Sequence, residues 1–477
     1  MLLFCDPNGP SSLRRRDFLR VGGAALGGAL FGNALFPALS SNTAFGSVSG
    51  SGGVSPLSGK SVIFLFMQGG PPQAETFDPK EGLTAEMAPV GGTIPTSIPG
   101  VHFGSSLPKL ARLADRLTIV RNFSTGTDHG GLRPIVSDTT GGASLGSVYS
   151  RVAGINNPRT GLPTSMALWP ISVGADQPGP RERFGKFDAT GSLGTGYAPF
   201  TPGAGGPMQE NLKLNLPRER LTDRRELLSA IDRARRDLDA QGDAVDGFRR
   251  QAFDMILKGV GQAFDLSNED PKLLERYDTR PFLDPSLWTP KTGKMKNNDP
   301  YYRANANTLG RLLVLARRMA EAGCGFITVN TEFVWDFHAD VNNIAVAEGK
   351  KAVIEPFDHA VSAFIEDCES RGLGDKILLV CCGEMGRNPK LNKNGGRDHW
   401  PALAPLILYG AGMPRGQVVG RSNRTGAEPD GDGLKPDNLL ATIFRTLFDM
   451  GQLRVETGLP EIIRQAVNRT QDLPGVV

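Results

Sequence analysis

The segment Ser61-Val62-Ile63-Phe64-Leu65-Phe66-Met67 is an unbroken apolar run, and it stops at Gly69-Gly70-Pro71-Pro72. A short apolar run that ends at glycine and proline is typical of a strand buried on both faces, as in parallel sheets covered by helices. A second run, at residues 376–382, is equally continuous. The two runs therefore predict central strands of a buried sheet.

Strand-like and helix-like segments alternate around these two runs. Further strands are predicted at residues 117–120, 325–330 and 405–409, and helices at 107–113, 312–322, 356–368 and 437–450. Alternation of this kind indicates an α/β fold. We therefore expect a central, mostly parallel sheet flanked by helices.

Length and charge limit the function classes. A chain of 477 residues can form one large α/β domain with insertions, or two to three smaller domains. Its 53 Lys and Arg residues nearly balance 50 Asp and Glu residues, so we expect no nucleic-acid partner. The five cysteines include no C-x-x-C spacing, which argues against a zinc knuckle or a thioredoxin-like motif.

The N-terminus has the features of a targeting segment. Arg14-Arg15-Arg16-Asp17-Phe18-Leu19-Arg20 matches a twin-arginine pattern, and a weakly apolar Gly/Ala-rich run follows at residues 21–39. Glycines interrupt that run too often for a permanent membrane span. We predict a signal peptide at residues 1–44 and a Ser/Gly-rich linker at 45–58. Export to the periplasm or the extracellular space, with no stable span after signal removal, is the expected outcome.

Residues 59–477 are expected to form one domain with an insertion at 205–300. Residues 218–264 are rich in Arg, Asp, Leu and Ala at helical spacing, which predicts a solvated helical hairpin with ion pairs. A basic surface for a polyanionic glycan is the alternative interpretation. Residues 283–300, rich in Pro, Lys and Asn, are predicted to be a loop.

Possible metal ligands follow the C-terminal strands, in the clusters Trp335-Asp336-Phe337-His338, Gly383-Glu384-Met385-Gly386-Arg387 and Gly396-Arg397-Asp398-His399-Trp400-Pro401. Two of the five histidines of the chain lie in these clusters beside carboxylates. Such side chains bind zinc or manganese, and carboxylates also bind calcium or magnesium. Since α/β sheets place sites beyond strand ends, we predict a divalent-metal site. Taken singly, each cluster could also be a helix cap or an ion pair.

Two loop features leave alternatives open. His129, in Asp128-His129-Gly130-Gly131, is either a ligand or substrate contact or a loop histidine without a role. The stretch Gly141-Gly142-Ala143-Ser144-Leu145-Gly146 lacks the lysine of a phosphate-binding P-loop, so we do not expect nucleotide binding.

The strands and polar clusters described above, in their order along the chain, resemble the alkaline phosphatase and sulfatase superfamily. They resemble more closely the exported bacterial family called domain of unknown function 1501. The resemblance covers residues 58–455. It is carried by residues 64–80, 107–114, 120–123, 140–141, 335–338, 384–389 and 396–401. It implies a sheet wrapped by helices, a metal site at the strand ends and hydrolysis of an anionic phosphate or sulfate ester, for instance on a sulfated or phosphorylated glycan.

The resemblance also implies roles for individual residues. The implied metal ligands are Asp336, His338, Glu384 and His399, with Asp398 beside the last and with Glu75 and Asp78 as further candidates. The near family usually has Asp where Glu75 stands. Arg387 or Arg397 would suit an anionic substrate, because a guanidinium can bind two oxygens at once.

The nucleophile is where the chain departs most from the superfamily. Sulfatases carry a C/S-x-P-x-R motif nine residues before a Thr-Gly pair, but Gly131 occupies that position before Thr140 and the motif occurs nowhere in the chain. Formylglycine chemistry is therefore excluded. The candidate substitutes are hydroxyl side chains: Ser137, Thr140, Thr139, Ser124 and Thr127. Alternatively, water activated by a divalent cation, which lowers the pKa of the water to ~7, attacks directly.

Two function hypotheses follow. The first is an exported metal-dependent hydrolase of phosphate or sulfate esters. The second is a non-catalytic exported binding or cell-surface protein that retains the fold. The carboxylate and histidine clusters favour the first hypothesis, and the missing nucleophile motif favours the second.

Overall fold

The computed structural model describes residues 55–129, 134–180, 187–203, 260–284, 298–469 and 473. The predicted signal peptide, most of the linker and the predicted hairpin at 218–264, apart from its last five residues, lie outside this part of the chain. The domain boundaries therefore stay predictions. In the part of the chain that the structure describes, no helix is long and apolar enough to cross a membrane.

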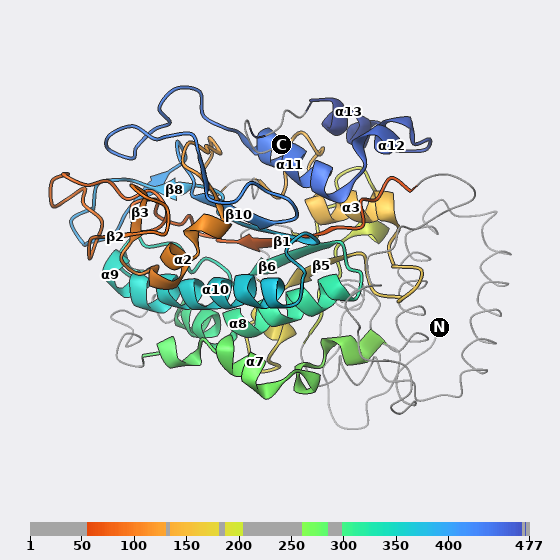
Figure 1. Ribbon diagram of the computed structural model, residues 1–477, viewed down its shortest axis with the longest axis horizontal. Coiled ribbons are helices and arrows are strands. Elements are labelled where there is room, and N and C mark those ends of the chain that lie inside the picture. Colours follow the sequence, from red (N-terminus) through yellow and green to blue (C-terminus); the bar gives the residue numbers. More distant parts are fainter. Residues whose placement is uncertain are drawn as a thin grey trace, which may run out of the picture.

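A seven-stranded sheet lies at the centre, in the order β11-β4-β10-β7-β1-β6-β5 (Figure 1). Its strands are β1 (Ser61–Phe66), β4 (Thr118–Val120), β5 (Ser165–Leu168), β6 (Phe326–Asn330), β7 (Ile377–Cys382), β10 (Leu406–Gly410) and β11 (Gln417–Val419). β10 is antiparallel to both of its neighbours, and the other pairs are parallel. The predicted α/β class with a mostly parallel sheet is confirmed.

β1 is the central strand, and its side chains supply both cores. Phe64 is in register with Thr328 of β6 and with Val380 of β7. Every residue of β1 and β7 is buried, as the continuous apolar runs predict. Successive side chains of a strand point to opposite faces, so Ile63 joins the core on one face and Phe64 the core on the other.

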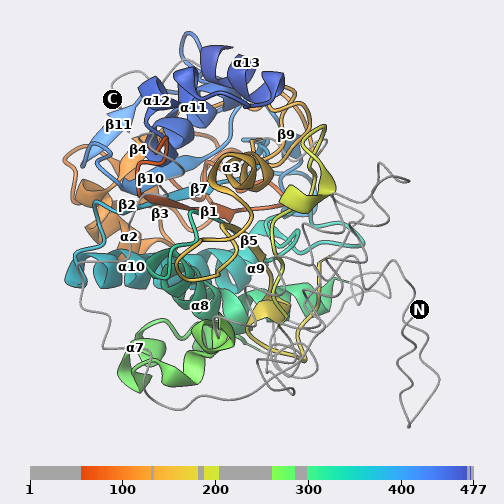
Figure 2. The ribbon, with the colours of Figure 1, turned by 90° about the vertical axis from the view of Figure 1, so that its right-hand side faces the viewer.

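Helices cover both faces of the sheet, as Figures 1 and 2 show. On one face lie α8 (Asp299–Glu321) and α10 (Glu355–Ser370), with α7 (Pro271–Arg276) outside α8. The other face is covered by α3 (Leu145–Ala153), α11 (Pro436–Leu447), α12 (Met450–Val455) and α13 (Glu461–Arg469). The short α2 (Pro108–Arg112) contacts α10. The helices predicted around 107–113, 356–368 and 437–450 are thus present.

The prediction for α8 was wrong at its N-terminal end. The helix begins at Asp299, whereas the sequence predicted a loop through 300 and a helix from Leu312. Asn, Thr and Gly in the first half are weak helix formers, so propensity gave no signal there. Burial decides instead, because Asn305 and Thr308 are packed inside.

A π-helical segment, Lys350–Ile354, joins α9 (Val346–Gly349) to α10. Pro356 follows this segment by two residues and has no N–H to donate to the carbonyl of Ala352 four residues earlier. The Nδ2 group of buried Asn305 donates to that carbonyl instead, at 3.2 Å. A side chain from α8 therefore supplies one donor to this helix.

Several short elements were not predicted. They are the edge strands β5 and β11, the helix α3, the pair β2 (Thr93–Pro95) and β3 (His102–Gly104), and the pair β8 (Gly386–Arg387) and β9 (His399–Trp400). Short 3₁₀ turns occur at Ala114–Arg116, Pro170–Ser172, Thr195–Tyr197, Val260–Phe264, Leu266–Asn268 and Arg280–Phe282. Of these, the β8–β9 pair matters most for function, because its register places Arg387 opposite His399.

Candidate metal centre

Four strands that run in the same direction, β4, β7, β1 and β6, deliver loops to one edge of the sheet. Those loops carry His129 after β4, Gly69 after β1, Asp336 after β6 and Glu384 after β7. Because the carboxyl ends of these strands lie together, residues far apart in sequence converge there. This edge is where the sequence predicted a metal site.

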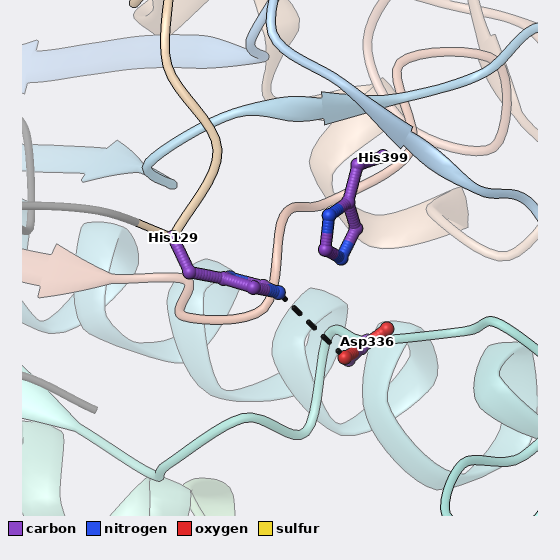
Figure 3. Close-up of side chains that lie close together, drawn as sticks. All are labelled: His129, Asp336 and His399. Atoms are coloured by element: carbon purple, nitrogen blue, oxygen red, sulfur yellow. Dashed lines mark ion pairs between the residues drawn. The ribbon is translucent and has the colours of Figure 1, made fainter. Parts of the chain in front are cut away.

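Three side chains form the candidate metal centre: His129, Asp336 and His399. One possible ligand atom from each lies within 4.8 Å of the others. The Nε2 atom of His129 is 3.8 Å from Oδ2 of Asp336, and the two imidazole rings meet edge to face with centroids 4.3 Å apart. Figure 3 shows both rings directed toward the carboxylate. This geometry brings an imidazole–carboxylate–imidazole donor set to one point.

Asp336 is buried, with only 7% of its surface exposed. Its Oδ1 atom contacts Nη2 of Arg387 at 2.8 Å and the Nδ1 atom of His338, whereas Oδ2 faces His129. Burial alone would raise the pKa of Asp336, but the charge of Arg387 and the hydrogen bond with His338 outweigh it and lower the pKa to about 2. The carboxylate is therefore ionised at neutral pH, which is the form that binds cations.

His399 is the group whose surroundings fit a metal ion best. Its Nε2 atom is buried and has no hydrogen-bond partner in the part of the chain that the structure describes, while Nδ1 lies 3.9 Å from the carboxylate of Asp128. Burial, together with the charge of Arg387 and the nearby imidazoles, lowers the pKa of His399 to about 4. A neutral imidazole is the form that ligates metals, and a buried polar atom without a partner is costly. The set of two imidazoles and one carboxylate therefore fits zinc or manganese better than magnesium or calcium, which prefer oxygen ligands.

His129 is held from behind by Glu384. Its Nδ1 atom lies 2.6 Å from Oε1 of Glu384, whose carboxylate also accepts the backbone N–H of Gly69 at 2.9 and 3.2 Å. The ring of His129 also packs edge to face on Phe333, with centroids 4.9 Å apart. His129 thus lies beside Asp336 and His399, and its role as a ligand stays a prediction.

Arg387 is fully buried, and its guanidinium binds the protein itself. It donates from Nε to the carbonyl of Gly70 at 3.0 Å, from Nη1 to that of Arg397 at 3.1 Å and from Nη2 to that of Gly69. Nη1 also lies 2.7 Å from Nδ1 of His338. A guanidinium only donates, so Nδ1 accepts from Arg387 when it carries no proton. In the other tautomer Nδ1 carries the proton and donates to Asp336. This geometry indicates that Arg387 fixes Asp336, and it leaves no free edge for the predicted substrate contact.

Glu75 and Arg397 form a buried ion pair with each other. The Nη2 atom of Arg397 lies 2.8 Å and Nε 2.9 Å from the carboxylate of Glu75, and both residues are at most 1% exposed. Further donors of Arg397 bond to the carbonyls of Ala88, Asn388 and Pro389. The sequence predicted that Glu75 is a metal ligand and that Arg397 binds the substrate. In the structure, the ion pair between them instead joins the loop after β1 to the loop that carries Arg397.

The other predicted carboxylates lie apart from the group of three. Asp78 is buried and contacts Nζ of Lys80 at 3.0 Å and Nε of Arg121 at 3.3 Å. Asp398 is exposed and accepts a 3.0 Å hydrogen bond from Asn392. His338 lies close by, with its ring centroid 4.5 Å from that of His399, but its Nδ1 atom is already engaged.

Ser137 and Thr140, two of the predicted hydroxyl nucleophiles, hydrogen-bond within their own turn. Oγ1 of Thr140 lies 2.6 Å from the carbonyl of Ala143 and 2.9 Å from that of Ser137, and Thr140 is 1% exposed. Among the described residues, neither hydroxyl hydrogen-bonds to the candidate metal ligands. Thr127 differs, because its Oγ1 atom is buried with no hydrogen-bond partner among the residues described, and it lies two positions before His129.

Solved structures similar to this one include the lipoteichoic acid synthase of Listeria monocytogenes, at 9% identity, covering 79% of this chain and 74% of that one, with a TM-score of 0.29. An alkaline phosphatase from the Antarctic bacterium TAB5 is 15% identical, covering 75% of this chain and 93% of that one, with a TM-score of 0.29. The phosphonate monoester hydrolase of Silicibacter pomeroyi is 10% identical, covering 81% and 73%, with a TM-score of 0.31. Similarity this low carries no argument about activity.

Sequence comparison gives a firmer result. No curated protein matches the chain. The family model described as "protein of unknown function (DUF1501)" matches residues 59–458, which is most of the sequence and nearly all of the described part. The chain therefore belongs to the family called domain of unknown function 1501.

Proposed function

We propose that this protein is a metal-dependent hydrolase of phosphate or sulfate esters. The observation that carries the proposal is the convergence of His129, Asp336 and His399, whose ligand atoms lie within 4.8 Å of one another. The buried Nε2 atom of His399 supports it further, because it has no hydrogen-bond partner among the described residues and a buried polar atom without a partner is costly. A site built from neutral imidazole and carboxylate suits a divalent cation.

The chain's own residues have distinct tasks in this proposal. Asp336 presents Oδ2 to the ion while Arg387 and His338 hold Oδ1, and His399 presents its neutral Nε2. A bound divalent cation supplies Lewis-acid polarisation of an ester oxygen and makes water more acidic. Arg387 keeps a positive charge beside the ligands without reaching the solvent. The substrate is an anionic ester, and a sulfated or phosphorylated glycan is one candidate.

For the attacking group, the proposal has two candidates. One is water, and the other is the hydroxyl of Thr127, which has no hydrogen-bond partner within the described ranges and precedes His129 by two residues. A Thr127→Val variant separates the two: activity persists if water attacks and is lost if the hydroxyl does.

Export by the twin-arginine route is part of the same proposal. Its only support is the Arg14–Arg20 pattern. Export by this route would deliver the enzyme to the periplasm or outside the cell. Replacing Arg14, Arg15 and Arg16 by lysine should retain the protein in the cytoplasm of a host with this pathway. Export of the lysine variant at the wild-type rate would contradict this part of the proposal.

A second function, a non-catalytic exported binding protein, is favoured by one observation. The two arginines that could grip an anionic substrate, Arg387 and Arg397, are both fully buried and bonded to protein groups. In that case the ion would stabilise the fold by binding only the native state.

Metal content decides whether the site exists. The protein should be stripped with chelator, reloaded separately with zinc, manganese, magnesium or calcium, and assayed by elemental mass spectrometry. We expect about one equivalent of one of these ions, lost in both Asp336→Asn and His399→Ala. Asp398→Asn is the matched control, because Asp398 neighbours His399 but is exposed and outside the group. Failure of the wild type to bind any of the ions would overturn the proposal.

Activity then separates the two functions. The loaded protein should be assayed against aryl phosphate, phosphonate and sulfate esters. Hydrolysis that disappears in Asp336→Asn supports the hydrolase. Stoichiometric metal binding without turnover of any of these esters, together with a lower melting temperature after chelation, identifies the binding protein.

A further inference from the structure

The two nitrogens of the His129 ring face different carboxylates. Nδ1 lies 2.6 Å from Oε1 of Glu384, and Nε2 lies 3.8 Å from Oδ2 of Asp336. The first distance is a hydrogen bond, whereas the second is too long for one. The ring is therefore fixed from the Glu384 side and presents its other nitrogen toward the candidate metal centre.

The direction of the short hydrogen bond follows from the surroundings of Glu384. Its two oxygens both accept the backbone N–H of Gly69, at 2.9 and 3.2 Å, and the residue is 1% exposed. Carboxylate oxygens accept hydrogen bonds and an imidazole N–H donates them, so this geometry assigns the donor role to Nδ1 of His129. The ring then carries its proton on Nδ1 and a lone pair on Nε2. That is the tautomer a metal ligand needs at Nε2.

The backbone of Gly69 links this clamp to the other arm of the site. Gly69 has φ +110°, and a Cβ atom there would lie 2.5 Å from the backbone nitrogen of Asp336. One residue therefore donates its N–H to Glu384 and packs directly on the loop that carries Asp336. The position of His129 relative to Asp336 is set by a short, buried connection.

We infer that Glu384 is a positioning residue: its carboxylate holds Nδ1–H of His129 so that Nε2 faces Asp336. The sequence analysis assigned Glu384 to the metal itself. In the structure Glu384 lies behind His129 and outside the group of three ligand atoms. The metal-binding consequence rests on the proposed function, but the tautomer of His129 is a property of the metal-free protein.

The first test reads the tautomer directly. Histidine-selective ¹⁵N labelling leaves five side chains to observe, and a His129→Gln variant assigns the resonance. In metal-free protein at pH 7.5 we expect His129 protonated at Nδ1 in the wild type and in Glu384→Gln, which keeps an acceptor oxygen. Glu384→Ala should lose that preference. Protonation at Nε2 in the wild type, or an unchanged tautomer in Glu384→Ala, would overturn the inference.

The second test separates positioning from ligation. Outer partners of metal-bound histidines typically change affinity by about 10–100-fold when removed. In calorimetric titration with zinc, Glu384→Ala should bind zinc about 10–100-fold more weakly than the wild type, with unchanged stoichiometry. His129→Ala should bind no stoichiometric zinc. Loss of stoichiometric binding in a folded Glu384→Ala would make Glu384 a ligand and overturn the inference. Circular dichroism confirms that each variant is folded, and Glu384→Gln should bind more tightly than Glu384→Ala.

The two tests also distinguish this inference from the proposed function. If the wild type binds no zinc, manganese, magnesium or calcium, the hydrolase proposal fails. The tautomer measurement still decides the role of Glu384 in that case, because it needs no ion.

Discussion

Replacing Arg397 by methionine removes one half of a fully buried ion pair. Its partner Glu75 is 1% exposed, and among the described residues only the backbone N–H of Val90, 3.1 Å away, would remain as a hydrogen-bond donor to its carboxylate. Removing one partner of a buried pair typically costs about 3–5 kcal/mol, because the other charge stays desolvated. That is a large fraction of the roughly 5–15 kcal/mol that stabilises a typical native protein.

The assay is urea unfolding at pH 7, followed by circular dichroism. Arg276→Met is the matched control, because Arg276 pairs with Glu366 at 3.5 Å on the surface, where the two side chains are 47% and 55% exposed. An exposed pair contributes about 0–1 kcal/mol, so the control should unfold almost as the wild type does. The double variant Glu75→Gln with Arg397→Met should lose less stability than the two single variants added together. That follows because the second change removes the uncompensated charge.

A cost for Arg397→Met no greater than that for Arg276→Met would refute this reasoning. Normal stability combined with a raised KM for an anionic ester would instead support the substrate-binding role that the sequence suggested for Arg397.

Three further outcomes are expected. Asn305→Ala leaves the free carbonyl of the π-helix without its donor and should cost about 1–3 kcal/mol in urea unfolding, whereas removal of the exposed amide in Asn394→Ala should change little. The pKa of His399 is lowered from 6.5 to about 4 in the folded protein. As the pH falls, the ring is therefore protonated in the unfolded chain before it is protonated in the folded protein. The stability that the neutral ring contributes is therefore complete above pH 6.5 and is lost as the pH falls toward 4. The stability difference between wild type and His399→Gln should shrink over that window, and a difference that grows on acidification would contradict the pKa shift. Gly69→Ala should strain a left-handed backbone, and its new methyl group should collide with the loop that carries Asp336. It should therefore lower the melting temperature and weaken zinc binding more than Gly82→Ala, where the new methyl group meets nothing within 4 Å.

Much of the fold could be predicted because the central strands are buried on both faces. β1 and β7 therefore appear as unbroken apolar runs, and such runs can be identified from local composition. The strand ends could be predicted for the same reason, and with them the clusters that carry Asp336, Glu384 and His399. Elements of two to four residues, such as the β8–β9 pair, are too short to show a period.

The pairing of charged groups could not be predicted. Glu75 and Arg397 are 322 positions apart, and His129 and Glu384 are 255 apart. The sequence showed that each was a candidate for chemistry, since each lies near a strand end or a tight turn. Which of them turn toward an ion and which toward each other depends on how four loops pack at one edge of the sheet.

For this chain, the sequence by itself determined the α/β class, the central strands and the family. The tertiary structure decided that His129 joins Asp336 and His399, and that Arg387, Arg397 and Glu75 are engaged within the protein. The physical reason is that burial of apolar runs is encoded locally. The partner of a buried charge is chosen by desolvation and geometry, which exist only once distant loops are in contact.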